Sequence, residues 1–178
     1  MNRPVALLFA SLAACAPTQP CPTCPACPAC PECPEADGPA EDRTPPNEWF
    51  VLHVTDGDTL VARLEGARIE RKETIRLLNI DTPEKGEPGF DEATEALKYL
   101  VRGARIRLEF ENPNAEKRDG FGRLLAYVIV NGENVNVEMV RMGWSRFYTK
   151  YGRGRLAAAF EKAESEARAQ GKGLWAFP

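Results

Sequence analysis

The most informative absence in this chain concerns cysteine. All six cysteines lie within the first 33 of its 178 residues, at positions 15, 21, 24, 27, 30 and 33. The rest of the chain therefore has no disulfide and no cysteine-based metal site. It also has a single histidine, His53. Any chemistry there must come from carboxylates, arginines, hydroxyls or that one imidazole.

Long hydrophobic runs and an excess of charge are absent as well. The apolar run Val5–Ala10 is far shorter than the roughly 20 residues that span a bilayer. Lys and Arg number 23 against 26 Asp and Glu, and hydrophobic residues make up 43%, which is a globular composition. The length predicts one ordinary domain with a remainder.

Residues 1–14 have the pattern of a secretory signal peptide. A basic start, the apolar run and small residues up to Ala14 follow in that order. Leu12-Ala13-Ala14-Cys15 resembles the lipobox of bacterial lipoproteins, which are cut before the cysteine. The resemblance implies that Cys15 carries lipid and anchors the protein to the cell envelope, facing the periplasm or the cell surface. Ordinary secretion with a coincidental cysteine is the alternative.

Residues 15–47 are expected to form a low-complexity stalk. Cys-Pro-x occurs five times from Cys21, and proline at every third residue favours polyproline II. The sulfurs would then lie along one edge about 9 Å apart, so neighbours could not pair unless the polyproline segment bent. The stalk is either a stiff spacer or a site of intermolecular disulfides or of attachment to another envelope component. Its candidate cysteines are Cys21, Cys24, Cys27, Cys30 and Cys33.

Residues 48–178 are expected to form the folded domain. Alternating apolar positions predict strands, and apolar positions three or four apart predict helices. The mixture fits an α+β domain, mainly a small β barrel with about three helices. Strands are expected at 49–54, 58–64, 69–80, 105–110 and 124–130, and helices at 90–101, 137–142 (with Asn136 as N-cap) and 155–170.

Three short segments at predicted strand ends concentrate the acids and arginines. Each alone has an ordinary interpretation, as a hairpin turn, a helix start or a solvated charge. Together, Asp56, Asp58, Asp81 and Glu84 could surround one hard cation with oxygen ligands, and two arginines could grip a phosphate. That combination suits phosphodiester hydrolysis. The segments are Asp56-Gly57-Asp58-Thr59, Arg76-Leu77-Leu78-Asn79-Ile80-Asp81-Thr82-Pro83-Glu84 and Arg118-Asp119-Gly120-Phe121-Gly122-Arg123.

In this order the segments resemble the thermonuclease (staphylococcal nuclease-like) family, over Trp49 to Trp175. The resemblance implies a five-stranded OB-fold barrel that cleaves DNA and RNA with Ca²⁺. It implies that Asp58 and Asp81 bind Ca²⁺ through their side chains and Thr82 through its carbonyl, with Asp56 behind them through water. It further implies that Glu84 activates water and that Arg76 and Arg123 bind the scissile phosphate.

Some positions depart from the family pattern. Phe121 stands where the family often has Tyr, and Gly120 where a Lys is common. Both changes concern substrate affinity rather than the hydrolytic residues. Tyr148 and Tyr151 are expected either to stack on a base or to pack against the barrel rim. Residues 98–155 hold 12 basic and 6 acidic residues, which favours a polyanionic partner.

A second class of function uses the same barrel without turnover. An OB-fold can serve as a nucleic-acid or protein-binding module on an envelope lipoprotein. Loss of one of the acids or arginines would favour that interpretation. All of them are present, so the sequence favours the enzyme.

Overall fold

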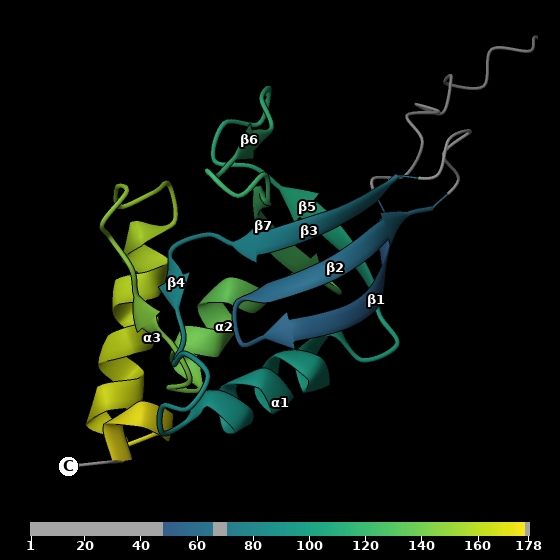
Figure 1. Cartoon of the computed structure of the whole chain (residues 1–178). Coiled ribbons are helices and arrows are strands. Elements are labelled where there is room, and N and C mark those ends of the chain that lie inside the picture. Colours follow the sequence, from purple (N-terminus) through teal and green to yellow (C-terminus); the bar gives the residue numbers. More distant parts are fainter. Residues whose placement is uncertain (1–47, 66–70, 177–178) are drawn as a thin grey trace, which may run out of the picture. The chain divides into compact units, whose positions relative to one another are not determined.

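The computed structural model describes residues 48–65 and 71–176 (Figure 1). The predicted signal peptide 1–14, the lipidation of Cys15 and the cysteine-rich stalk 15–47 lie outside the described residues. None of the helices in the described part has the length and apolar character needed to cross a bilayer.

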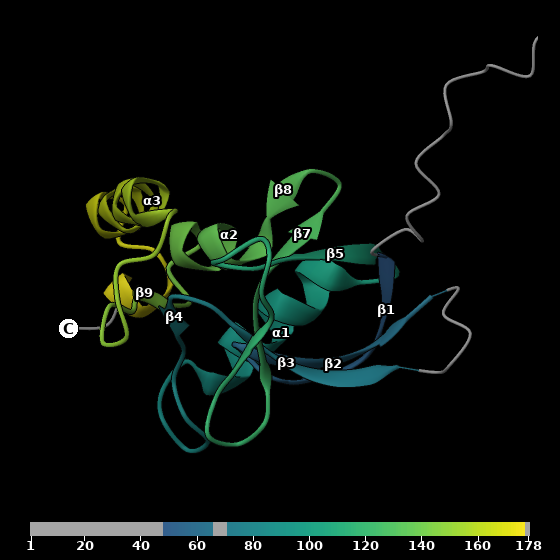
Figure 2. The ribbon, with the colours of Figure 1, turned by 90° about the horizontal axis from the view of Figure 1, so that it is seen from above.

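Five strands form a closed barrel. β1 pairs with β2 and β5, β2 with β3, and β5 with β7, all antiparallel, and a parallel pairing of β3 with β7 closes the ring (Figures 1 and 2). With three helices, this barrel confirms the predicted α+β OB-fold architecture. The barrel strands are β1 (Glu48–Asp56), β2 (Thr59–Leu64), β3 (Lys72–Leu77), β5 (Arg105–Glu109) and β7 (Leu124–Val130).

Short strands and helices complete the domain. β6 and β8 extend the sheet beside β7, while β4 pairs with β9 in a separate ladder. α2 and α3 lie side by side, on the side of the barrel away from β1 and β2 (Figures 1 and 2). The bounds are β4 (Ile80–Asp81), α1 (Phe90–Val101), β6 (Lys117–Arg118), β8 (Glu133–Asn134), α2 (Val135–Arg141), β9 (Arg146–Phe147), α3 (Ala157–Ala169) and the 3₁₀ helix η1 (Gly173–Ala176).

One hydrophobic core joins the barrel to the helices. Ile106 and Leu108 of β5 alternate with exposed arginines, as expected for a strand with one wet face. Ala93 and Leu97 place one face of α1 in the core, and Phe160 does the same for α3. Full burial of each large side chain contributes about 1.5–3 kcal/mol, so this core holds the strand ends in fixed positions.

The strand expected over residues 69–80 is wrong as a single element. Within its described part, β3 ends at Leu77 and β4 begins at Ile80. Asn79 lies between them with a φ of 59°, in the left-handed region that a strand cannot contain. The chain bends there, so Arg76 and Asp81 lie on different strands on either side of the bend.

The cap predicted at Asn136 is also wrong, because Asn134 caps α2. The Asn134 side chain accepts a hydrogen bond from the Val137 N–H at 3.0 Å. Asn136 is fully buried inside the helix and bonds to the barrel, accepting from the Val128 N–H at 2.9 Å and donating to the Leu78 carbonyl at 2.9 Å. Tertiary partners therefore decide the role of each asparagine.

Candidate active site

The strands bring the three motif segments to one end of the barrel. Thr59, at the start of β2, pairs with Arg76 near the end of β3. Arg76 in turn pairs with Leu125 of β7, two residues after Arg123. The Leu77 N–H also donates to the Asp58 carbonyl at 2.8 Å. Residues far apart in sequence thus meet because of the barrel register.

Arg76 holds the two predicted metal-binding carboxylates together. Its Nη2 lies 2.9 Å from Asp58 Oδ2 and 3.5 Å from Asp81 Oδ1. Its Nη1 donates to the carbonyls of Leu77 at 2.9 Å and Ile80 at 3.0 Å, which fixes the guanidinium plane. Both carboxylates therefore converge on one nitrogen atom.

Arg123 joins the same cluster through a threonine hydroxyl. Thr59 Oγ1 donates to Asp58 Oδ1 at 2.9 Å and accepts from Arg123 Nη1 at 3.5 Å. Arg123 Nε donates to Asp119 Oδ2 at 2.7 Å, which orients the guanidinium group. Although burial opposes ionisation, the hydrogen bonds from Arg123 hold the pKa of Asp119 below its usual value.

The segment that carries Asp58 packs tightly against Thr82. The Thr82 hydroxyl and N–H donate to Asp58 Oδ2 at 3.3 Å and 3.4 Å. A Cβ on Gly57 would lie 2.8 Å from Thr82 Oγ1 and 2.9 Å from the Cβ of Ala93 in α1. The glycine of the Asp-Gly-Asp motif therefore allows a close approach that no other residue permits. Asp56 supports the same turn, because its Oδ1 accepts from the Asp58 N–H at 3.1 Å.

Asp81 has a fixed backbone and an exposed side chain. The Asp81 N–H donates to Oγ of the fully buried Ser145 at 2.9 Å, and that hydroxyl lies 3.0 Å from the Asp81 carbonyl. The pairing of Asp81 with Arg146 across β4 and β9 adds to this support. The Asp81 carboxylate is 52% exposed, so it is open to solvent and to a ligand.

Asp58 is the carboxylate of the cluster whose ionised form is destabilised by its surroundings, and it is called strained in this sense. Burial raises its pKa to about 6, the Arg76 guanidinium opposes this shift, and the Asp56 carboxylate reinforces it. The carboxylate has thus lost more by desolvation than it gains from its ion pair. A cation beside it would stabilise the ionised form.

Glu84 lies in the loop between β4 and α1. Its backbone N–H donates to Glu87 Oε2 at 2.9 Å. Its side chain is exposed, and within the described residues its carboxylate has no ion-pair partner. Although Glu84 is only two residues after Thr82 in the chain, its carboxylate does not contact the Asp58–Arg76–Asp81 cluster.

Three aromatic side chains singled out in the sequence are partly or fully exposed. Tyr148 is half-buried and Tyr151 is 82% exposed, and their rings lie edge to face with centroids 6.0 Å apart. Phe121 is 87% exposed, and Arg123 Cζ lies 5.4 Å from the centre of its ring. Tyr151 and Phe121 thus expose apolar rings that contribute little to the core.

The predicted donors match Ca²⁺ in chemistry, since two carboxylates and a carbonyl are all hard oxygen ligands. The raised pKa of the buried Asp58 carboxylate, which a cation would offset, also fits a metal. In the described part of the chain, however, no three acidic, histidine or cysteine side chains form a group that could hold a metal ion. Water would therefore have to complete the coordination, and the cation would compete with Arg76 for Asp58.

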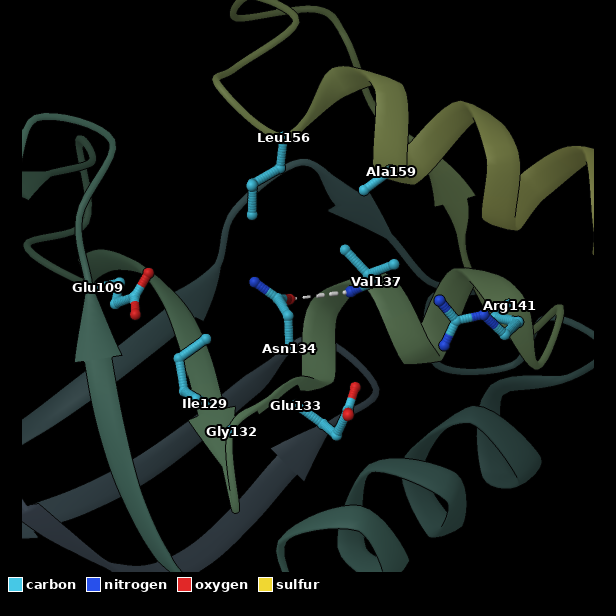
Figure 3. Close-up of a pocket in the computed structure, with 9 residues that line it drawn as sticks. All are labelled: Glu109, Ile129, Gly132, Glu133, Asn134, Val137, Arg141, Leu156 and Ala159. Carbon is cyan, nitrogen blue, oxygen red and sulfur yellow. Dashed lines mark hydrogen bonds between the residues drawn. The ribbon is translucent and has the colours of Figure 1, made fainter.

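A pocket of about 340 Å³ lies elsewhere, lined by the β7–β8 hairpin, α2 and α3 (Figure 3). None of its lining residues belongs to the predicted site. Its Arg141 is already paired with Glu138 and Glu166, and its Glu109 with Arg155. The sequence motifs and this pocket therefore mark different places.

Two supporting residues were not anticipated from the sequence. Thr59 belongs to the first motif segment, so its hydroxyl could have been considered as a link between Asp58 and Arg123. Ser145 carries no such signal, because nothing in the surrounding Gly-Trp-Ser-Arg suggests contact with Asp81 more than sixty residues earlier.

Comparison with known proteins gives consistent results. Residues 74–177 match the family described as staphylococcal nuclease homologue. The SPbeta prophage-derived endonuclease YokF of Bacillus subtilis is 33% identical over 127 residues, covering 67% of this chain and 41% of that protein. Endonuclease YncB of the same species is 32% identical over 127 residues, covering 67% and 57%. A thermonuclease of Staphylococcus intermedius is 31% identical over 135 residues, covering 71% and 75%. The chain spans about half the length of the two Bacillus relatives.

Proposed function

The chain belongs to the family of staphylococcal nuclease homologues, and on that premise we propose that it is a Ca²⁺-dependent endonuclease that hydrolyses phosphodiester bonds of DNA or RNA. The observation that carries the proposal is the convergence of Asp58, Asp81 and Arg76, with Arg123 joined to them through Thr59. The arginines suit a phosphodiester substrate, which is anionic and becomes more so in its transition state, and the acids suit the cation proposed beside them.

Each side chain of the site has a distinct proposed task. Arg76 and Arg123 bind the scissile phosphate, because a guanidinium is always protonated and its planar fork matches phosphate oxygens. Glu84 accepts a proton from the attacking water, and its exposed carboxylate leaves it open to that water. Asp58, Asp81 and the Thr82 carbonyl would hold Ca²⁺, with Asp56 behind them. Bound there, Ca²⁺ would polarise the phosphate and make a bound water more acidic.

The aromatic side chains serve nucleotide binding in this proposal. Tyr148 and Tyr151 stack on a base of the substrate, as aromatic residues do in proteins that bind single strands. Phe121 lacks the hydroxyl that Tyr would supply, so it offers a ring face beside Arg123 rather than a hydrogen bond.

The experiment is hydrolysis of single-stranded DNA with Ca²⁺ or with a chelator. We expect the wild-type protein to cut only with Ca²⁺. Glu84→Gln should lower kcat about a hundredfold or more, because general base catalysis contributes on that scale. Glu92→Gln is the matched control, since Glu92 is an exposed glutamate of α1, and it should behave as wild type. Equal, metal-independent background in all three proteins would contradict the proposal.

A non-catalytic nucleic-acid or protein-binding module is the second candidate function. One observation favours it: Arg76 contacts both carboxylates of the cluster, so a cation would have to compete with it for Asp58. Oligonucleotide binding without cleavage under any metal condition would support this candidate over the enzyme.

We also propose that the protein is exported and anchored to the cell envelope by lipid on Cys15, with a stalk up to residue 47. The support is the sequence pattern of residues 1–15 and the Cys-Pro repeats. Radiolabelled fatty acid should label the wild-type protein and not Cys15→Ser. Equal labelling of both proteins would contradict the anchor. Intermolecular disulfides through the stalk cysteines would appear as species that a reductant dissociates.

A further inference from the structure

Asn79 lies between two residues of the proposed site, Arg76 and Asp81, in the turn from β3 to β4. Its φ of 59° is one that asparagine adopts more readily than other non-glycine residues. Its side chain is half-buried and uses both its donor hydrogens and its oxygen in hydrogen bonds. Such complete use of a turn residue goes beyond what the turn itself requires.

Residues 148–154, here called the tyrosine loop, are fastened to Asn79 at two points. The Tyr148 N–H donates to the Asn79 carbonyl at 2.9 Å. Asn79 Nδ2 donates to the carbonyl of Tyr148 at 3.1 Å and to that of Gly152 at 3.0 Å. Tyr151 lies between these two points. One asparagine therefore fixes both ends of the segment that carries the two tyrosines.

The barrel core fixes Asn79 in turn. The hydroxyl of the buried Tyr127 lies 2.9 Å from Asn79 Oδ1 and 2.6 Å from Glu111 Oε2, and Glu111 Oε1 accepts from the Arg155 N–H at 2.8 Å. Burial and the Glu111 carboxylate raise the pKa of Tyr127, so its hydroxyl remains a donor. A Cβ on Gly154 would lie 2.5 Å from Asn79 Oδ1, so the loop passes directly over this network.

We propose that Asn79 is a positioning residue for the substrate base: it holds the rings of Tyr148 and Tyr151 at a fixed place relative to Arg76 and Asp81. The inference rests on the proposed function and deepens it. Since Asn79 is three residues from Arg76 in the chain and bonds directly to the loop, a base stacked on the loop and a phosphate on Arg76 would belong to one nucleotide chain. Holding the loop in advance removes the cost of ordering it when substrate binds.

The glycines of the tyrosine loop show why the hydrogen bonds from Asn79 are needed. Gly152 and Gly154 have φ values of 115° and 70°, and glycine loses more conformational freedom on ordering than any other residue. Without the bonds from Asn79, the segment between Tyr148 and Gly152 would sample many conformations, and few of them would present both rings to one base.

The test uses Asn79→Gly, which keeps the left-handed turn and removes only the side-chain bonds. Binding of two fluorescent single-stranded oligonucleotides is measured in chelator, where the substrate is not cut; one is ordinary DNA and the other has abasic sites. We expect the variant to bind ordinary DNA about tenfold more weakly, within the range that base–aromatic stacking supplies. Its affinity for abasic DNA should equal that of wild type. With Ca²⁺, KM should rise while kcat stays within about twofold.

The matched control is Asn131→Gly. Asn131 is the other non-glycine residue with positive φ in the described part of the chain, at 51°, and it lies exposed in the β7–β8 turn. It should bind both oligonucleotides as wild type does. Tyr127→Phe, which keeps the ring and loses the hydroxyl, should cause a smaller loss of the same base-dependent kind.

The outcomes separate this inference from the proposed function. If Asn79→Gly binds ordinary DNA as wild type does, or loses affinity equally for ordinary and abasic DNA, the positioning role is wrong. If wild type shows no base-dependent binding, the role is wrong as well. Failure of the wild-type protein to cut DNA with Ca²⁺, while base-dependent binding persists and is lost in Asn79→Gly, would overturn the nuclease and support the positioning role.

Discussion

Two carboxylates beside arginines behave in opposite ways in this molecule. Near the start of β3, two partly exposed arginines surround Glu73 in what is here called the surface network: Arg118 forms a bidentate pair with it at 2.7 Å, and Arg71 forms a further bond at 3.0 Å. The hydrogen bonds from Arg118 lead the causes that hold the pKa of Glu73 below its usual value. In the proposed site, Asp58 lies 2.9 Å from Arg76, yet burial raises its pKa to about 6.

The difference shows that an adjacent arginine does not by itself stabilise a carboxylate. The side chains of Glu73 and Asp58 are similarly covered, at 13% and 10% exposed, but their partners differ. Glu73 has two arginine partners that are 35% and 42% exposed, whereas Asp58 has one arginine that is 15% exposed and a second carboxylate, Asp56, close by. The surface network favours the folded state, while the site keeps a charge in a position that disfavours it. Such unfavourable electrostatics is common where a protein binds a cation or an anionic substrate.

The largest expected effect concerns activity. Arg76→Lys removes the planar fork and should lower kcat about a hundredfold or more, because a single ammonium cannot hold both the carboxylates and a phosphate. Arg118→Lys makes the same change in the surface network and should leave the kcat for single-stranded DNA within about twofold of wild type. Similar losses in the two variants would mean that the two regions do not differ as described.

The second effect concerns stability and has opposite signs in the two regions. Asp58→Asn removes the buried charge and should raise the free energy of unfolding by about 1–3 kcal/mol at pH 7.5 in chelator. Glu73→Gln should lower it by at most about 1 kcal/mol, because Arg118 is 42% exposed and solvent screens the pair. Urea unfolding measures both changes, and a destabilised Asp58→Asn would refute the interpretation of Asp58 as strained.

The smallest effect is the pH dependence of that second comparison. Since the folded pKa of Asp58 is above its usual value of 3.8, protonation favours the folded state, and this stabilisation is lost as pH rises towards about 6. The advantage of Asp58→Asn over wild type should therefore be full at pH 7.5 and nearly absent at pH 4. Glu73 stabilises the fold at neutral pH and loses that contribution as pH falls. A gap between Asp58→Asn and wild type that does not change with pH would contradict this assignment.

Most of the fold could be predicted from the sequence, because apolar periodicity is a local property. The expected strand at 124–130 has the observed bounds of β7, and the expected helix at 90–101 has those of α1. The motif residues Asp58, Arg76 and Asp81 also lie together, while the roles that the family resemblance implies for them stay predictions.

What could not be predicted depends on distant partners. Asn79 lies in the turn that follows β3, and its side chain bonds to the tyrosine loop about 70 residues later. Asn134 and Asn136 both lie at the start of an apolar helical segment, and only the neighbouring β7 decides which of them is the cap. Ser145 is brought to Asp81 by the pairing of β4 with β9. Strands of two residues are too short to be recognised in a sequence, so this pairing could not be predicted.

The parallel pairing of β3 with β7 has a consequence for when the folding protein becomes active. It pairs Ile75 with Leu124, almost fifty residues apart, and such non-local closures are slow steps of folding. Arg76 lies within this pairing, and Arg123 directly precedes it. A chain whose barrel is still open holds the two guanidinium groups apart and cannot present them to one phosphate. The proposed activity therefore requires complete folding, because the step that closes the barrel also brings together the two arginines that bind the phosphate.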